Sequence, residues 1–152
     1  MKYLRLAICL ILPQLAGFLG SLFTIKSIDN WYLYLNKPSF NPPNWIFGPV
    51  WTLLYLLMGF SIYLIWQKKR KNKKVFWIFW VHLFFNAIWT PIFFGLHNLG
   101  LAFACIVLIW LFIIYLIISF WKINKLSSIF LWPYLLWVSF AAILNYSIWQ
   151  LN

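Results

Sequence analysis

The sequence predicts an all-α integral membrane protein, a bundle of five transmembrane helices with the N-terminus inside and the C-terminus outside. The 152-residue chain is 65% hydrophobic and 9% charged, with one acidic residue, so it cannot present the polar surface that water requires. Its five apolar runs are each long enough, at about 1.5 Å per residue, to cross a hydrocarbon core of about 30 Å. They predict a single domain over residues 1–152, with helices at about 6–25, 46–66, 75–95, 99–121 and 129–151.

Cations are spread unevenly along the chain and set the predicted orientation. The run KKRKNKK, residues 68–74, holds six of the twelve lysines and arginines. The same predicted side also receives Lys2, Arg5, Lys122 and Lys125, and only Lys26 and Lys37 fall on the other side. Because cytoplasmic loops are enriched in Lys and Arg, this side is predicted to be the cytoplasmic one. We interpret the basic run as a topology signal that contacts anionic lipid headgroups, and we expect no nucleic-acid partner.

The first apolar run, residues 6–25, is longer than the core of a signal peptide, which favours a retained helix over a cleaved leader. Pro13 and Gln14 interrupt it in a way that a packed membrane helix tolerates. Gly17 and Ser21 lie one helical turn apart, so a neighbouring helix can approach closely there.

The segment WYLYLNKPSFNPPNWIFGPVW, residues 31–51, combines three tryptophans with four of the seven prolines. Aromatic side chains with a polar N–H or O–H suit sites that are apolar on one side and wet on the other. Pro42 and Pro43 hold the chain extended before the second helix, and Pro49 is expected within its first turn. We therefore predict that residues 26–45 form a lid over a pocket and that Trp51 forms its upper wall.

Three helices carry stripes that point to this pocket. His82, Asn86 and Trp89 follow i, i+4, i+7 spacing in the third helix, so they face the bundle interior. The second helix aligns Trp51, Tyr55 and Met58, and the fifth aligns Trp137, Ala141, Leu144 and Asn145. His82 and Asn86 either bond neighbouring helices or orient a ligand, and His82 as an axial ligand of a metalloporphyrin is a further alternative. Such aromatic faces around a few amides suit a flat, apolar ligand.

The chain lacks the residues that most hydrolytic enzymes need. One aspartate cannot supply a pair of carboxylates, and His82 and His97 are fifteen residues apart with no carboxylate nearby. The two cysteines, Cys9 and Cys105, show no metal or disulfide spacing, and no phosphate-binding glycine loop or nucleophile elbow occurs. We predict no metal site and no required cofactor.

Three blocks of sequence resemble the TspO/MBR family of tryptophan-rich sensory proteins and translocator proteins. They are residues 31–66, with WY, KPS, PP, GPVW, LY and MG, the block FNAIWTPIFFG at 85–95, and WPYLLWVSFAAILNYSIWQLN at 132–152. The resemblance implies a five-helix bundle, a homodimer, and a pocket that binds porphyrins such as protoporphyrin IX and haem-like tetrapyrroles, and also benzodiazepine-type ligands. It also implies a bacterial cell membrane or, alternatively, a mitochondrial outer membrane.

Stripes and family motifs together give the predicted ligand-binding residues Trp31, Trp51, Tyr55, His82, Asn86, Trp89, Phe93, Trp137, Ala141 and Leu144. His82 stands where relatives often have an amide, which predicts ligand binding that depends on pH near neutrality. Cys105 stands where many relatives have an acidic residue, and Gln150 replaces the basic residue of the family's proposed sterol motif.

Three functions follow from this resemblance. The first is a membrane receptor or sensor that binds porphyrins. The second is a light-dependent enzyme that degrades porphyrin, in which Trp137 and Trp51 would be the catalytic residues. The third is a passive transporter of tetrapyrroles or lipids. Active transport is disfavoured, because the spans contain no charge and no internal repeat.

Overall fold

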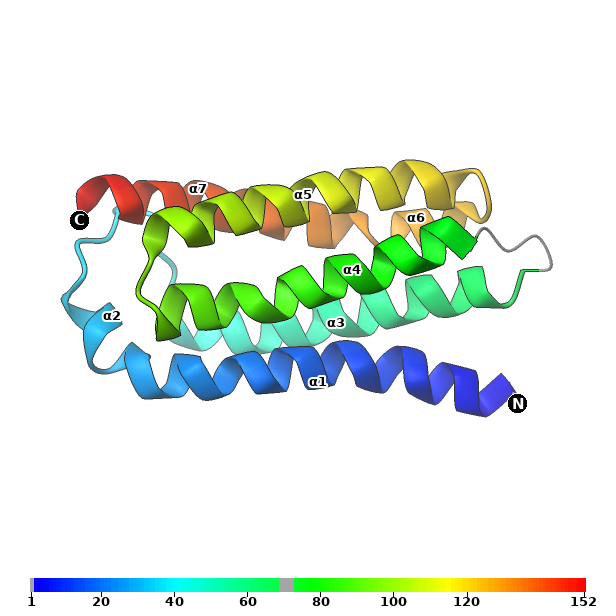
Figure 1. The fold of residues 1–152 in the computed structure, drawn as a ribbon, viewed down its shortest axis with the longest axis horizontal. Coiled ribbons are helices and arrows are strands. Elements are labelled where there is room, and N and C mark those ends of the chain that lie inside the picture. Colours follow the sequence, from blue (N-terminus) through cyan, green and yellow to red (C-terminus); the bar gives the residue numbers. More distant parts are fainter. Residues whose placement is uncertain (1, 69–72) are drawn as a thin grey trace.

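The computed structural model of the chain describes residues 2–68 and 73–152, and this part of the chain is helical without a strand (Figure 1). Five helical segments there are long and apolar enough to cross a membrane: Lys2–Ile28, Asn44–Trp66, Lys73–Gly95, Leu99–Trp121 and Lys125–Leu151. The predicted all-α membrane bundle is thus confirmed. Residues 69–72 of the predicted basic loop lie outside the described residues.

The first half of the chain contains two long helices and one short one. Helix α1 (Lys2–Ile28) extends the predicted 6–25 span at both ends and keeps Pro13 buried inside it. The short α2 (Trp31–Tyr34) follows, and a segment that contains a turn at residues 38–41 leads to α3 (Asn44–Trp66). Because α3 begins two residues before the predicted position 46, Pro49 lies beyond its first turn and not within it.

The second half contains two predicted helices that are interrupted. Helix α4 (Lys73–Thr90) passes at Pro91 into a π-helical turn, η1 (Pro91–Gly95), since proline cannot continue the α-helical hydrogen bonds. Helix α5 (Leu99–Trp121) is continuous and is capped by Asn98. The predicted fifth helix is divided into α6 (Lys125–Ile129) and α7 (Trp132–Leu151), which begins around Pro133.

The long helices pack side by side in the order α3, α1, α4, α5 and α7, and α3 and α7 touch only sparingly (Figure 1). The N-terminal end of α1 and the C-terminal end of α7 lie at opposite ends of the bundle, as five spans require. The α5–α6 turn lies at the N-terminal end, and α2 lies at the other end. We call these the basic end and the α2 end. Which end faces the cytoplasm stays a prediction.

The basic half of the bundle is tightly packed. Met58 and Ile62 of α3, Phe79 of α4 and Ile113 of α5 are all inaccessible to solvent. Close approach of α1 and α3 depends on Gly59, because a Cβ there would lie 2.5 Å from the carbonyl oxygen of Cys9. This packing leaves the other half of the bundle as the place where a cavity can form.

Candidate ligand-binding cavity

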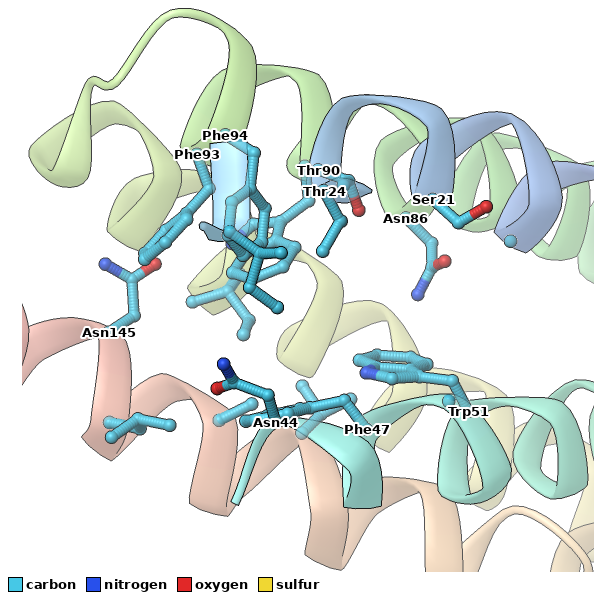
Figure 2. Close-up of a pocket in the computed structure, with 18 of the residues that line it drawn as sticks. Ser21, Thr24, Asn44, Phe47, Trp51, Asn86, Thr90, Phe93, Phe94 and Asn145 are labelled. Atoms are coloured by element: carbon cyan, nitrogen blue, oxygen red, sulfur yellow. The ribbon is translucent and has the colours of Figure 1, made fainter. Parts of the chain in front are cut away.

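A cavity of about 440 Å³ lies between the helices in the α2 half of the bundle (Figure 2). Its volume is typical of small-molecule sites, which span about 300–1,000 Å³. All five spans and the segment before α3 contribute to its lining, which includes Gln14, Gly17, Phe18, Ser21, Thr24, Tyr32, Phe47, Trp51, Tyr55, Asn86, Trp89, Phe93, Ile106, Ile109, Ala141, Leu144 and Asn145.

Aromatic rings form opposite parts of the wall. Trp51 of α3 lies on one side with its indole toward the cavity, and Phe93 of η1 lies on the other (Figure 2). Trp89 stacks on Phe93, with ring centroids 5.2 Å apart, and Trp51 contacts Tyr55 at 5.5 Å. Flat faces of this kind favour a planar, apolar ligand that can stack against them.

A buried chain of hydrogen bonds forms the floor of the cavity and joins three helices. The Tyr55 hydroxyl of α3 donates to Asn86 Oδ1 of α4 at 2.7 Å. Asn86 Nδ2 donates to the Tyr134 hydroxyl of α7 at 2.7 Å, and that oxygen lies 2.8 Å from His82 Nε2. All four side chains are buried, so these bonds pair polar atoms that would otherwise have no partner.

The pairing along this chain fixes the direction of one of the two bonds to Tyr134. Since Asn86 Nδ2 can only donate, the Tyr134 oxygen accepts from it, and the direction of the bond between Tyr134 and His82 Nε2 depends on the tautomer of the imidazole. His82 therefore supports Asn86 through Tyr134, as the prediction of bonds between neighbouring helices anticipated.

The segment between α1 and α3 covers the α2 end of the cavity. Tyr32 reaches the cavity from α2, and its hydroxyl donates to Asn41 Oδ1 at 2.9 Å. Burial raises the pKa of the Tyr32 phenol, so it remains a neutral donor. The segment is also tied to the end of α7, because the Asn36 N–H donates to Asn152 Oδ1 and Asn152 Nδ2 donates to the Asn36 carbonyl, both at 3.0 Å.

The structure brings seven of the ten predicted ligand-binding residues to the cavity wall: Trp51, Tyr55, Asn86, Trp89, Phe93, Ala141 and Leu144. The other three lie behind it. Trp31 stacks on His97, with centroids 4.1 Å apart, and meets the edge of Phe93. His82 is 1% exposed below Asn86, and Trp137 packs against Phe47 and Phe140.

Sequence reasoning missed the wall that α1 contributes. Gln14, Gly17, Ser21 and Thr24 all line the cavity, and their i, i+3, i+7, i+10 spacing is a signal that could have revealed it. The sequence predicts only a site of helix approach at Gly17 and Ser21. That interpretation agrees with the position of Gly17 directly against the Tyr55 ring.

No group of three His, Cys, Asp or Glu side chains that could hold a metal ion occurs in residues 2–68 and 73–152. His82 Nε2 is occupied by Tyr134, and the imidazole lies off the cavity wall. It is therefore not positioned to bind a metal held in the cavity.

The amino-acid sequence is similar to those of known proteins. The sequence profile of the TspO/MBR family matches residues 9–150. The chain belongs to this family. It is thus an integral membrane protein of the TspO/MBR receptor and sensor class, in agreement with its five apolar helices.

Proteins similar to this chain occur in distantly related organisms. The tryptophan-rich protein TspO of Chlorobaculum tepidum is 42% identical, with 99% of this chain and 98% of the relative covered. The protein of the same name from Archaeoglobus fulgidus is 39% identical over 100% of this chain and 99% of its own. The human translocator protein is 35% identical over 92% of this chain and 85% of its own.

Proposed function

We propose that this TspO/MBR protein is a membrane receptor or sensor that binds porphyrins, such as protoporphyrin IX, and other flat apolar ligands in the cavity between its helices. The observation that carries the proposal is the pairing of facing aromatic walls, Trp51 on one side and Trp89 stacked on Phe93 on the other, with a polar floor at Asn86. A porphyrin offers a large π-face to such rings and polar groups at its edge and centre. Two of the relatives come from prokaryotes, which supports a location of this protein in a prokaryotic cell membrane.

Two unpaired polar atoms beside the cavity support a ligand with polar edge groups. Trp89 Nε1 and Asn145 Oδ1 are buried and have no hydrogen-bond partner among the described residues. Both side chains contribute to the cavity lining, and Asn145 lies at its end near Phe93 (Figure 2). Since buried polar groups are usually paired, a small shift of the side chains that cover these atoms would let a ligand carboxylate or carbonyl reach Trp89 Nε1 and an N–H or O–H reach Asn145 Oδ1.

The test is a titration of the protein in lipid nanodiscs with protoporphyrin IX, followed by the absorption band of the porphyrin. We expect saturable binding that Trp51→Ala weakens at least tenfold, about 1.4 kcal/mol. The matched control is Trp121→Ala, since Trp121 is 48% exposed at the basic end of α5. Equal affinities in the wild type and both variants would contradict the proposed site.

A second candidate function, light-dependent degradation of porphyrin, is favoured by the same indole. Trp51 would donate an electron to a photoexcited ring lying against it, so no acid or base residue is required. Trp137 is less favourable for this role than Trp51, because Phe47 lies against the Trp137 indole behind the cavity wall. Illumination should form a new absorbing product that Trp51→Phe abolishes and Trp137→Phe only slows. Bleaching at the same rate in both variants would indicate ordinary photodamage.

A further inference from the structure

The cavity has exposed residues along one side, between α1 and α3. Phe18 and Ile25 of α1 contribute to its lining and are 62% and 68% exposed. Gly48 and Thr52 of α3 also contribute to the lining and are exposed. A residue that lines the cavity and is also exposed on the outer surface of the protein lies at the rim of an opening. We call the opening between these four residues the α1–α3 slot.

The slot ends where α1 and α3 come together toward the basic end. Gln14 Nε2 of α1 donates to the Thr52 carbonyl of α3 at 2.9 Å. One turn away, Gly17 lies directly against the Tyr55 ring. From this closure the two helices border the cavity toward the α2 end, and Figure 2 shows Ser21 and Thr24 of α1 across the cavity from Phe47 and Trp51 of α3.

The surface beside the slot is apolar. On α1, Leu22 is 44% exposed, and on α3, Trp45 and Leu53 are 73% and 56% exposed. Both helices are membrane-spanning segments. Exposed apolar side chains on such helices face acyl chains. The slot therefore opens toward the bilayer interior and not toward water.

The polar groups at the rim are satisfied within their own helices. The Ser21 hydroxyl donates to the Phe18 carbonyl at 2.7 Å, and the Thr52 hydroxyl donates to the Gly48 carbonyl at 2.9 Å. An apolar molecule that passes between them breaks no hydrogen bond and leaves no hydroxyl proton unpaired. The rim is thus suited to the passage of a ligand that is dissolved in lipid.

At Gly48 a side chain would meet no other helix. A Cβ at this position would have no atom within 4 Å apart from its chain neighbours Phe47 and Pro49 and the backbone of its own helix, and the residue lies inside α3. Glycine within a helix costs about 0.5–1 kcal/mol relative to alanine. The other helical glycines lie against neighbouring atoms, so only at Gly48 does the missing side chain leave open space. That space lies at the rim of the slot.

We infer that the α1–α3 slot is the route by which an apolar ligand passes between the bilayer and the cavity, and that Gly48 keeps this route open. The identity of the natural ligand rests on the proposed function, whereas the slot itself can be tested without a porphyrin. The chemical class of the molecule that uses it is an apolar or weakly amphiphilic compound dissolved in the half of the bilayer at the α2 end.

The test measures how a reagent reaches the cavity from lipid. Ala141→Cys introduces one thiol on the part of the cavity wall that α7 contributes, in a chain whose two native cysteines are buried. Nanodiscs are treated with a bilayer-soluble N-aryl maleimide or with a charged maleimide that stays in water, and peptide mass spectrometry gives the labelling rate at each cysteine. We expect the bilayer-soluble reagent to label the new thiol at least tenfold faster than the charged one.

Two double variants then test the role of Gly48. Adding Gly48→Phe should slow labelling by the bilayer-soluble reagent at least tenfold. Adding Leu53→Phe, on the lipid face of the same helix and outside the cavity lining, should leave the rate unchanged. Faster labelling by the charged reagent, an unlabelled thiol, or equal rates in the two double variants would each overturn the inference. Parallel titration of the wild type with protoporphyrin IX tests the proposed function, so that either idea can fail alone.

Discussion

Around Gly59, α1 and α3 lie so close that the Cys9 carbonyl oxygen would be 2.5 Å from an added Cβ, whereas around Gly48 on the same α3 an added Cβ would meet nothing within 4 Å. Both residues are glycines in one membrane helix that faces α1. At Gly59 the missing side chain allows backbones to touch, and at Gly48 it leaves a gap at the rim of the cavity. Along the α1–α3 pair, a small residue thus allows close helix packing at Gly59 and leaves room for a ligand to enter the cavity at Gly48.

Asn86 lies between the tightly packed basic half of the bundle and the α2 half, which holds the cavity. Its replacement should have the largest effect on stability. Asn86→Leu leaves the hydroxyls of Tyr55 and Tyr134 without their amide partner in a buried site. Each buried polar group left unpaired costs about 1–3 kcal/mol, so we expect a loss of about 3 kcal/mol in the free energy of unfolding. Denaturant titration in detergent micelles measures it.

A double-mutant cycle with Tyr134→Phe sharpens this result. Because both side chains belong to one hydrogen-bonded chain, the double variant should lose clearly less stability than the sum of the single losses. Additive losses would mean that Asn86 and Tyr134 act independently, and that the floor of the cavity is not a unit.

The two glycines give the second largest effect and the most direct test of the comparison. Gly59→Ala forces a methyl group against the backbone of α1 and should cost about 2 kcal/mol, since overpacking typically costs about 1–3 kcal/mol. Gly48→Ala meets no other helix, and its gain in helix propensity is opposed by the contact of the new Cβ with the Pro49 ring, so the change should stay within about 1 kcal/mol of neutral. Thermal unfolding of both variants in the same detergent gives the two shifts, and a loss at Gly48 equal to that at Gly59 would remove the distinction.

The spans could be predicted from composition because a bilayer accepts only long apolar helices with satisfied backbones. Their ends and interruptions could not. Helix α1 continues to Lys2 and Ile28 beyond its apolar run, and the fifth span breaks between α6 and α7 where only Pro133 gives a local signal. These features depend on contacts with other helices, such as the Ser61 hydroxyl donating to the Ser127 carbonyl.

The cavity was predictable where aromatic or amide side chains mark it, and less so elsewhere. Helical spacing placed Asn86 and Trp89 on the interior face, but spacing cannot tell which part of a broad face borders a cavity and which borders a neighbour. Trp137 therefore packs on Phe47 while Ala141, one turn away, lines the cavity. In the short α2, Tyr32 borders the cavity and Trp31 packs against His97. Tertiary contacts alone decide which of these two neighbouring aromatic residues reaches the cavity.

Two neighbouring serines in the basic half, Ser127 and Ser128, provide a matched pair with a smaller effect on stability. Both are fully buried, but only Ser128 has a bonded hydroxyl, which donates to the Ile117 carbonyl at 2.8 Å. Ser127 Oγ has no hydrogen-bond partner in the described part of the chain. Ser128→Ala should cost about 1 kcal/mol, and Ser127→Ala should be neutral or slightly stabilising. Unfolding in mild denaturant compares them, and the reverse order would contradict this assignment.

The smallest effect is expected at the α2 end, where the cover of the cavity is fastened to α7. Asn152 pairs with both backbone groups of Asn36, and these groups are exposed, so Asn152→Ala should cost only about 0.5 kcal/mol in the free energy of unfolding. The same change should loosen the cover locally, because its loss removes two of the bonds that hold residue 36. We expect faster amide hydrogen exchange in residues 35–41 with unchanged exchange around Gly59. Lys125→Ala, at the basic end, is the control, and equal exchange in the two variants would show that Asn152 does not hold the cover in place.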